Sequence, residues 1–254
     1  MKEIDINCDM GESYGNFKIG NDAAIFPYIT STNIACGMHA GDPFHIQKTI
    51  DQALQHNVQI GAHPGYPDLN GFGRKVIPMS ADELSATIKY QISALKGMVE
   101  ASGGTLSYVK PHGALYNEMA SNETEAKTVI EAIKSIDDSL MIMGLAGSHM
   151  RPLVEHAGMT FIAEAFADRR YEIDGKLRSR TKENALLNNG FDAAQQVISI
   201  AMNGKTQTLD NKTVAVEAQS FCIHGDNPAA IEILKEIHDQ IAANGIMKKA
   251  FSTA

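Results

Sequence analysis

The sequence predicts an α/β protein built as one (β/α)7 barrel over residues 1–254, and two observations support this class. Short β-branched or apolar runs alternate with longer stretches of helical period along the chain. The segment after the first run, NCDMGESYGN, lacks the G-x-G-x-x-G fingerprint of a dinucleotide-binding sheet. Parallel strands joined by helices, without that fingerprint, favour a closed barrel over a doubly wound sheet.

Seven runs have the composition of buried strands, and a helical segment follows each of them. In chain order the predicted strands are Glu3–Cys8, Asn33–Cys36, Gln59–Ala62, Leu106–Lys110, Leu140–Leu145, Phe161–Ala165 and Val214–Ile223. The stretch from Phe166 to Asn188 has no strong helical period, so we expect a long active-site loop there.

The clearest helix is predicted over Asp82–Ser102, because its apolar residues recur on one stripe with Ser80 as a candidate N-cap. That stripe consists of Leu84, Ile88, Ile92, Leu95 and Val99. A second clear helix is predicted over Pro228–Ala243. Asp42-Pro43 and Asn227-Pro228 each have the pattern of an N-cap followed by proline at the first helical position.

Composition excludes several classes of protein. With 254 residues, 44% of them hydrophobic, the chain can bury a full core. Its net charge of −8 argues against a nucleic-acid partner. No apolar run approaches the roughly 20 residues of a membrane helix, and the charged N-terminus does not resemble a signal peptide. The three cysteines are too dispersed for a disulfide framework, so we expect reduced, buried thiols in a cytoplasmic protein.

Four of the nine histidines share one local setting at the end of a predicted strand. They are His39, His63, His112 and His224, and each is followed within two residues by glycine. In a barrel, the C-terminal ends of the strands meet at one mouth, where functional residues collect. Imidazole gains or loses a proton near neutral pH, so we expect these four side chains to line a reactive site. The other five histidines lie in or beside predicted helices, where a structural role is expected.

Charged side chains occur at the same strand ends. They include Asp9, Glu12, Lys110, Glu164 and Arg169. Arg74, in the segment GFGRK after the third strand, offers a planar donor fork for a carboxylate or phosphate. The alternative for Arg74 is an ordinary turn with solvated charges, and for Arg169 a charged loop held by its own ion pairs.

Metal and nucleotide motifs are missing from the sequence. No H-x-x-x-H or H-E-x-x-H is present, so a metal site needs ligands from distant strands, for instance Asp9, His63 and His112. That possibility stays open at this stage. Gly204-Lys205-Thr206 is no P-loop, because it leaves a predicted helix and enters a strand.

The segments DINCDMGE, NIACGMHAGDP, GAHPGYPD with GFGR, and YVKPHGALYN together resemble the LamB/YcsF family. The resemblance extends from residue 4 to about residue 250 and includes EAFADRRY and CIHGDNP. Lys75 stands where a second arginine is expected, which keeps the charge. The resemblance implies a seven-stranded barrel similar to that of the glycoside hydrolases and polysaccharide deacetylases.

The resemblance also implies an activity, the ATP-dependent hydrolysis of 5-oxo-L-proline to L-glutamate by a 5-oxoprolinase. ATP, with Mg²⁺, is then the expected co-substrate, and subunits B and C are the expected partners. We expect catalytic roles for Asp9, His63, Lys110, His112 and Glu164. Substrate binding is expected from Glu12, His39, Arg74, Arg169 and His224.

Within these roles, Asp9 or Glu164 is the candidate base for water, and His63 and His112 are candidates to stabilise charge or to carry protons. Lys110 and Arg74 are candidates to hold the lactam oxygen or the substrate carboxylate. Two other functions stay open: a metal-dependent hydrolase similar to the deacetylases, and a non-catalytic subunit that binds the lactam.

Overall fold

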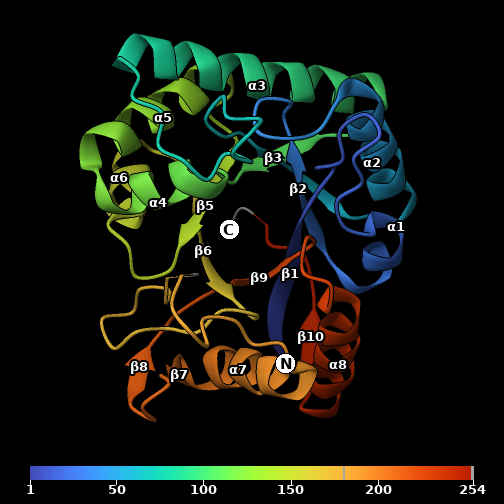
Figure 1. Cartoon of the computed structure of the whole chain (residues 1–254), viewed down its shortest axis with the longest axis vertical. Coiled ribbons are helices and arrows are strands. Elements are labelled where there is room, and N and C mark those ends of the chain that lie inside the picture. The colour runs from blue at the N-terminus through green and yellow to red at the C-terminus, as the bar shows by residue number, and fades with distance from the viewer. Residues whose placement is uncertain (180, 253–254) are drawn as a thin grey trace.

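In a computed structural model, which describes residues 1–179 and 181–252, seven parallel strands close into a barrel (Figure 1). The first strand, β1, pairs with both its sequence neighbour β2 and the last barrel strand β9, which closes the ring. The barrel strands are β1 (Lys2–Met10), β2 (Ser31–Ala35), β3 (Gln59–His63), β4 (Leu106–Val109), β5 (Met141–Leu145), β6 (Phe161–Phe166) and β9 (Ser220–His224). This arrangement confirms the predicted (β/α)7 barrel.

Helices surround the barrel and cover its outer face (Figure 1). They are α1 (Asp22–Ile25) with a 3-10 turn (Phe26–Tyr28), α2 (Pro43–Gln55), α3 (Ala81–Ala101), α4 (Gly113–Ser121), α5 (Glu123–Ile136), α6 (Met150–His156), α7 (Gly190–Asn203) and α8 (Ala230–Ala243). The predicted caps Ser80 and Asp42 both accept hydrogen bonds from the first turns of α3 and α2. Helix α8 begins at Ala230 instead, and the side chain of Asn227 accepts from the backbone N–H of Ala229.

The prediction of one strand over Val214–Ile223 is wrong. The segment contains two strands, because β8 (Thr213–Ala215) pairs antiparallel with β7 (Lys205–Gln207) outside the barrel. Only β9 enters the barrel. The sequence between β8 and β9 contains neither glycine nor proline, so no turn signal marked the break.

The interior of the barrel is polar along one strand. On β1, the alternating residues Asp5, Asn7 and Asp9 are all buried and point inward. Asn33 on β2 donates from Nδ2 to Asn7 Oδ1 (2.7 Å) and Asp9 Oδ1 (2.8 Å). These bonds connect the base of the barrel to its mouth and fix the position of Asp9.

The C-terminal segment covers the base of the barrel. The short strand β10 (Ile246–Lys248) pairs with the first residues of β1, and Phe251 then packs against Tyr108, with ring centroids 5.0 Å apart. The opposite end, where the strands reach their C-termini, is the end left for a binding site.

The loop predicted from Phe166 to Asn188 is confirmed as a long connection between β6 and α7, and two isolated bridges organise it, Arg169 with Leu186 and Tyr171 with Leu177. All three cysteines are buried free thiols, as expected. No helix in the described ranges is long and apolar enough to cross a membrane.

Candidate active site

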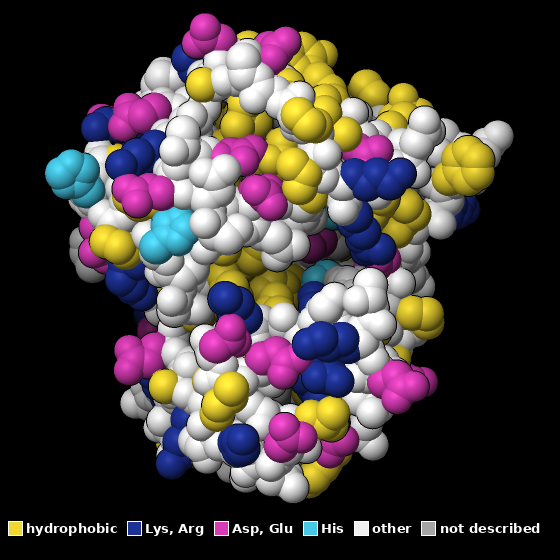
Figure 2. All heavy atoms as spheres, turned by 60° about the vertical axis from the view of Figure 1, so that its left-hand side comes forward, with side chains coloured by type: hydrophobic (Ala, Val, Ile, Leu, Met, Phe, Trp, Pro, Cys, Tyr) yellow, Lys and Arg dark blue, Asp and Glu magenta, His cyan; other side chains and the backbone are white. Residues whose placement is uncertain are grey.

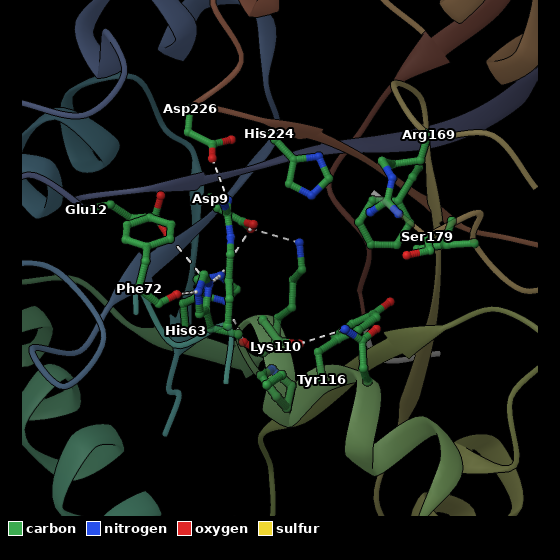
Figure 3. Close-up of a pocket in the computed structure, with 18 of the residues that line it drawn as sticks. Asp9, Glu12, His63, Phe72, Lys110, Tyr116, Arg169, Ser179, His224 and Asp226 are labelled. Carbon is green, nitrogen blue, oxygen red and sulfur yellow. Dashed lines mark hydrogen bonds and ion pairs between the residues drawn. The ribbon is translucent and has the colours of Figure 1, made fainter. Parts of the chain in front are cut away.

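A cavity of about 550 Å³ opens at the C-terminal mouth of the barrel (Figure 3). Eight of the ten predicted site residues line it: Asp9, Glu12, His63, Arg74, Lys110, His112, Arg169 and His224. The other two, His39 and Glu164, are fully buried directly behind its wall. Figure 2 shows a hollow on one face of the molecule with basic side chains on both sides of its opening.

Lys110 lies at the centre of the buried charges. Its ammonium contacts Asp9 Oδ1 and Glu164 Oε1, both at 2.8 Å. It also contacts Asn7 Oδ1 (3.2 Å) and Cys222 Sγ (3.1 Å). Burial opposes the charge, but the two carboxylates outweigh it and raise the pKa of Lys110 well above its usual range. The three N–H donors of the lysine are thus already used within the protein.

Asp9 and Glu12 are both buried, but the protein shifts their pKa values in opposite directions. For Asp9, burial is outweighed by His63 and Lys110, which hold the pKa of its carboxyl well below its usual value. For Glu12, burial and the nearby charge of Asp9 raise the pKa well above its usual value. The protein therefore favours the charged form of Asp9, which makes it a weak base, and the neutral form of Glu12, which makes its carboxylate the stronger base of the two.

Two histidines lie between these carboxyls and contact each other directly. His112 Nδ1 lies 2.9 Å from His63 Nε2, and the rings meet edge to face. His63 Nε2 is also 3.4 Å from Asp9 Oδ2, and His112 Nδ1 is 3.6 Å from Glu12 Oε1. The order across the pocket floor is therefore Asp9, His63, His112, Glu12.

His39 supports this pair from behind. Its ring stacks on His112, with centroids 3.7 Å apart and an interplanar angle of 5°. Its Nε2 lies 3.4 Å from Glu12 Oε1. Burial, with His112 and His63 nearby, lowers the pKa of His39 well below its usual value, so the ring stays neutral. The expectation that His39 contacts substrate is not supported, because its side chain is fully buried.

The outer wall of the pocket carries three further predicted residues. The Arg74 guanidinium pairs with Asp226 Oδ2 at 2.6 Å, and its side chain is about half exposed. Arg169 donates to the backbone carbonyl of Arg178 (2.7 Å). His224 Nδ1 contacts Asp168 at 2.9 Å. The structure therefore brings all three side chains to the opening, and each of them is held by another group of the same chain.

Sequence reasoning missed several residues of this site. Tyr116 on α4 donates its hydroxyl to Glu164 Oε2 (2.7 Å), and Asn7 and Asn33 hold the buried charges from below. Phe72, Asn117, Leu177, Ser179, Thr181 and Asp226 also line the pocket. Asp226 and Phe72 stood beside predicted residues in the sequence, but Ser179 and Thr181 come from an irregular loop without any motif.

Four side chains of the site, Glu12, His39, His63 and His112, also offer metal-ligand atoms that lie within 4.8 Å of one another. A zinc ion lies about 2.0–2.1 Å from a histidine nitrogen, and it binds the lone pair in the plane of the ring. The stacked rings of His39 and His112 are parallel, so one ion cannot lie in the plane of both. The direct contact between His63 and His112 also occupies the lone pair that a metal would need. These residues, and with them the set Asp9, His63 and His112, fit a hydrogen-bonded network better than a metal cage.

The fold and the site define a class: (β/α)7-barrel proteins with a pocket of buried histidines and carboxyls at the mouth of the barrel. The model of the LamB/YcsF family matches residues 4–254. The chain belongs to the LamB/YcsF family.

Similar proteins agree with this assignment over the whole chain. A relative from Bacillus cereus (strain AH187), described as the A subunit of 5-oxoprolinase, is 48% identical over 247 residues, which are 97% of this chain and 98% of the relative. The crystal structure of a lactam utilization protein from Thermus thermophilus is 38% identical, with a TM-score of 0.93, over 99% of this chain and 100% of that protein. A family 4 carbohydrate esterase from Streptomyces lividans, 12% identical with a TM-score of 0.52 over 99% of this chain and 93% of the esterase, shares the fold alone.

Proposed function

We propose that this chain is the A subunit of an ATP-dependent 5-oxoprolinase. In this proposal it opens 5-oxo-L-proline to L-glutamate, with ADP and phosphate as the other products, together with partner subunits of types B and C. The names of the similar proteins support the substrate class. We expect the complex in the cytoplasm, where ATP is available and the three buried thiols stay reduced.

One observation carries the chemical part of the proposal: two buried carboxyls with opposite pKa shifts flank a pair of histidines in one pocket. Hydrolysis of a cyclic amide needs a group that takes a proton from water and a group that gives a proton to the departing nitrogen. Sites that perform such acid–base chemistry have titratable groups whose pKa values are driven apart. Glu12 is the better candidate to exchange protons with water, in place of Asp9 or Glu164.

The other site residues have supporting roles in this proposal. Lys110 neutralises Asp9 and Glu164 and holds them in place, because its donors are already engaged by the protein. Arg74 and Arg169, at the outer wall, are the candidates to bind the substrate carboxylate. His224 lines the opening beside them.

ATP is the proposed co-substrate, with Mg²⁺. A five-membered lactam is stabilised by amide resonance and carries little strain, so its opening has little driving force. Transfer of the terminal phosphoryl group to the amide oxygen makes the ring carbon a better electrophile, and water then releases phosphate. The cavity of about 550 Å³ has more room than the lactam alone requires.

The first prediction tests this function in the reconstituted complex. The chain is purified with its candidate B and C subunits, and glutamate release from 5-oxoproline is measured with and without ATP. Glu12→Gln is expected to lower kcat by about 10²- to 10⁴-fold, because the proton-transfer group is lost. Glu131→Gln, an exposed position on α5, is the matched control and should turn over normally.

Three results would contradict the proposal. Near-normal turnover of Glu12→Gln would show that Glu12 is not the proton-transfer group. Binding of 5-oxoproline by the wild-type chain without glutamate release by the complex would identify a lactam-binding subunit. Turnover that needs no ATP and stops with a chelator would favour a metal-dependent hydrolase.

A further inference from the structure

The outer nitrogens of His63 and His112 both contact backbone carbonyl oxygens. His63 Nδ1 lies 2.7 Å from the carbonyl oxygen of Lys110. His112 Nε2 lies 2.8 Å from the carbonyl oxygen of Phe72. A carbonyl oxygen can only accept a hydrogen bond, so each of these nitrogens carries a proton.

The inner nitrogens of the same two rings contact each other. The distance from His63 Nε2 to His112 Nδ1 is 2.9 Å, within the range of a hydrogen bond. Without a proton between them, two lone pairs would face each other. With a proton on each, two hydrogens would collide. One proton therefore lies between the rings, and the pair holds three protons on four nitrogens, for a net charge of +1.

Charged and titratable groups face this pair from several elements. Asp9 from β1 lies beside His63, and Glu12 from the following loop lies beside His112. His39 stacks on His112 from the loop after β2, and Arg74 approaches from the loop after β3. Burial, the charge of His63 and that of Arg74 lower the pKa of His112 to about 3, against the carbonyl of Phe72 and the anion of Asp9. The carboxylate of Asp9, 3.4 Å from His63 Nε2, favours a position of the shared proton on the His63 side of the pair.

The loop after β3 is built to hold His112 in this state. Phe72, whose carbonyl oxygen accepts the hydrogen bond from His112, has a φ of 56°, a conformation that non-glycine residues rarely adopt. At Gly73, a Cβ atom would lie 2.7 Å from His112 Cδ2. Strained backbone of this kind persists where the surrounding structure demands it, often at functional sites.

We propose that His63 and His112 act as one unit that shares a single mobile proton, and that this proton goes to the ring nitrogen of a cyclic amide. The role of the proton in the reaction rests on the proposed function. As water attacks the ring carbon of the phosphorylated amide, Glu12 in its ionised form accepts a proton from that water. The carbon–nitrogen bond breaks with its electron pair leaving on nitrogen, and the shared proton of the pair binds there. The acyl phosphate that remains takes up a second water, which releases phosphate and leaves the free carboxylate. Glu12 then returns its proton to His112, which restores the starting state.

The second prediction is tested by NMR on the full chain alone, with ¹⁵N-labelled histidine. We expect both nitrogens of His63 to be protonated, and His112 to be protonated at Nε2 only. A ¹⁵N–¹⁵N coupling across the hydrogen bond should connect His63 Nε2 with His112 Nδ1. His112→Asn should abolish the coupling, whereas His238→Asn, a surface position on α8, should keep it.

A neutral His63 without this coupling would overturn the proposal. So would a spectrum that changes when a chelator is added, because the rings would then hold a metal in place of the proton. This measurement needs neither ATP nor partner subunits, so it can fail while the complex still releases glutamate. If the complex is active, His112→Asn should lower kcat at least about 10²-fold with little change in KM.

Discussion

At the scale of single residues, Lys110 determines whether the pocket can contain two buried carboxylates. The residue is 2% exposed, and its ammonium lies 2.8 Å from both Asp9 and Glu164. Each carboxylate would be costly to bury alone, and the lysine compensates both. The third prediction follows: Lys110→Met should lower the free energy of unfolding by about 3–5 kcal/mol, measured by urea denaturation at pH 7.

Lys96 provides a matched control for this prediction. It pairs with Glu100 and Asp137 near the surface, so Lys96→Met should cost less than about 1 kcal/mol. Adding Glu164→Gln to the Lys110→Met variant should recover part of the lost stability, because one uncompensated charge disappears. If both lysine variants unfold alike, the buried network contributes no more than a surface ion pair.

Residue-level prediction from sequence succeeded where a side chain lies at the C-terminal end of a strand or directly after it. His63, Lys110 and Asp9 were all expected at the mouth, and the strand ends place them there. The sequence contained no signal for Tyr116, which reaches Glu164 from a helix. It also did not distinguish His112, in the pocket, from His39, which packs behind it, because both precede glycine-containing turns.

At the scale of elements, β3 and β4 pack closely because β3 has a glycine where β4 has a tyrosine. Gly61 on β3 leaves the space that the ring of Tyr108 on β4 occupies, since a Cβ there would overlap the ring carbons. The Tyr108 hydroxyl in turn donates to Asn33 Oδ1 (2.7 Å), which orients the partner of Asp9. Hydrogen bonds from Tyr108 to Asn33 and from Asn33 to Asp9 therefore connect the packing of β3 against β4 with the active site.

The fourth prediction compares two glycine substitutions by thermal or urea unfolding. Gly61→Ala should lower the free energy of unfolding by about 1–3 kcal/mol through overpacking. Gly97→Ala on α3, where a Cβ meets nothing within 4 Å, should raise it by up to about 1 kcal/mol. In a Tyr108→Leu background, Gly61→Ala should cost less. An equal cost in both backgrounds would show that Tyr108 is not the obstacle.

Element boundaries were predictable where the chain carries a cap. The capping box at Ser80 begins α3 one residue before the predicted start. Boundaries without such signals were not predictable, as the break between β8 and β9 shows, because no turn residue separates the surface hairpin from the barrel strand. Which of these strands joins the barrel depends on long-range pairing with β1 and β6.

At the scale of the whole molecule, a buried acid joins the strands at the base of the barrel. Asp5 on β1 accepts hydrogen bonds from Ser31 on β2 (2.8 Å) and from Ser220 on β9, and so connects the three strands where the barrel closes. Thr30 donates to it as well (2.6 Å). Burial raises the pKa of Asp5 from 3.8 to about 6, although these hydroxyl groups favour its charged form.

The fifth prediction is the pH dependence that this shift imposes on the barrel. Between pH 3.8 and about 6 the folded state binds more protons at Asp5 than the unfolded state does, so this contribution to stability is complete below pH 3.8 and is lost as the pH rises through about 6. From about pH 4 to pH 7, the difference in unfolding free energy between Asp5→Asn and the wild type should move in favour of the variant by about 2 kcal/mol. Urea denaturation at several pH values measures this difference. The hydrogen bonds altered by the substitution change the unfolding free energy by the same amount at every pH, so they do not affect its change with pH. Asp239→Asn, on the exposed face of α8, is the control and should show no such change with pH. If the difference between Asp5→Asn and the wild type does not change with pH, folding does not favour the neutral form of Asp5 over the charged form, and the prediction is wrong.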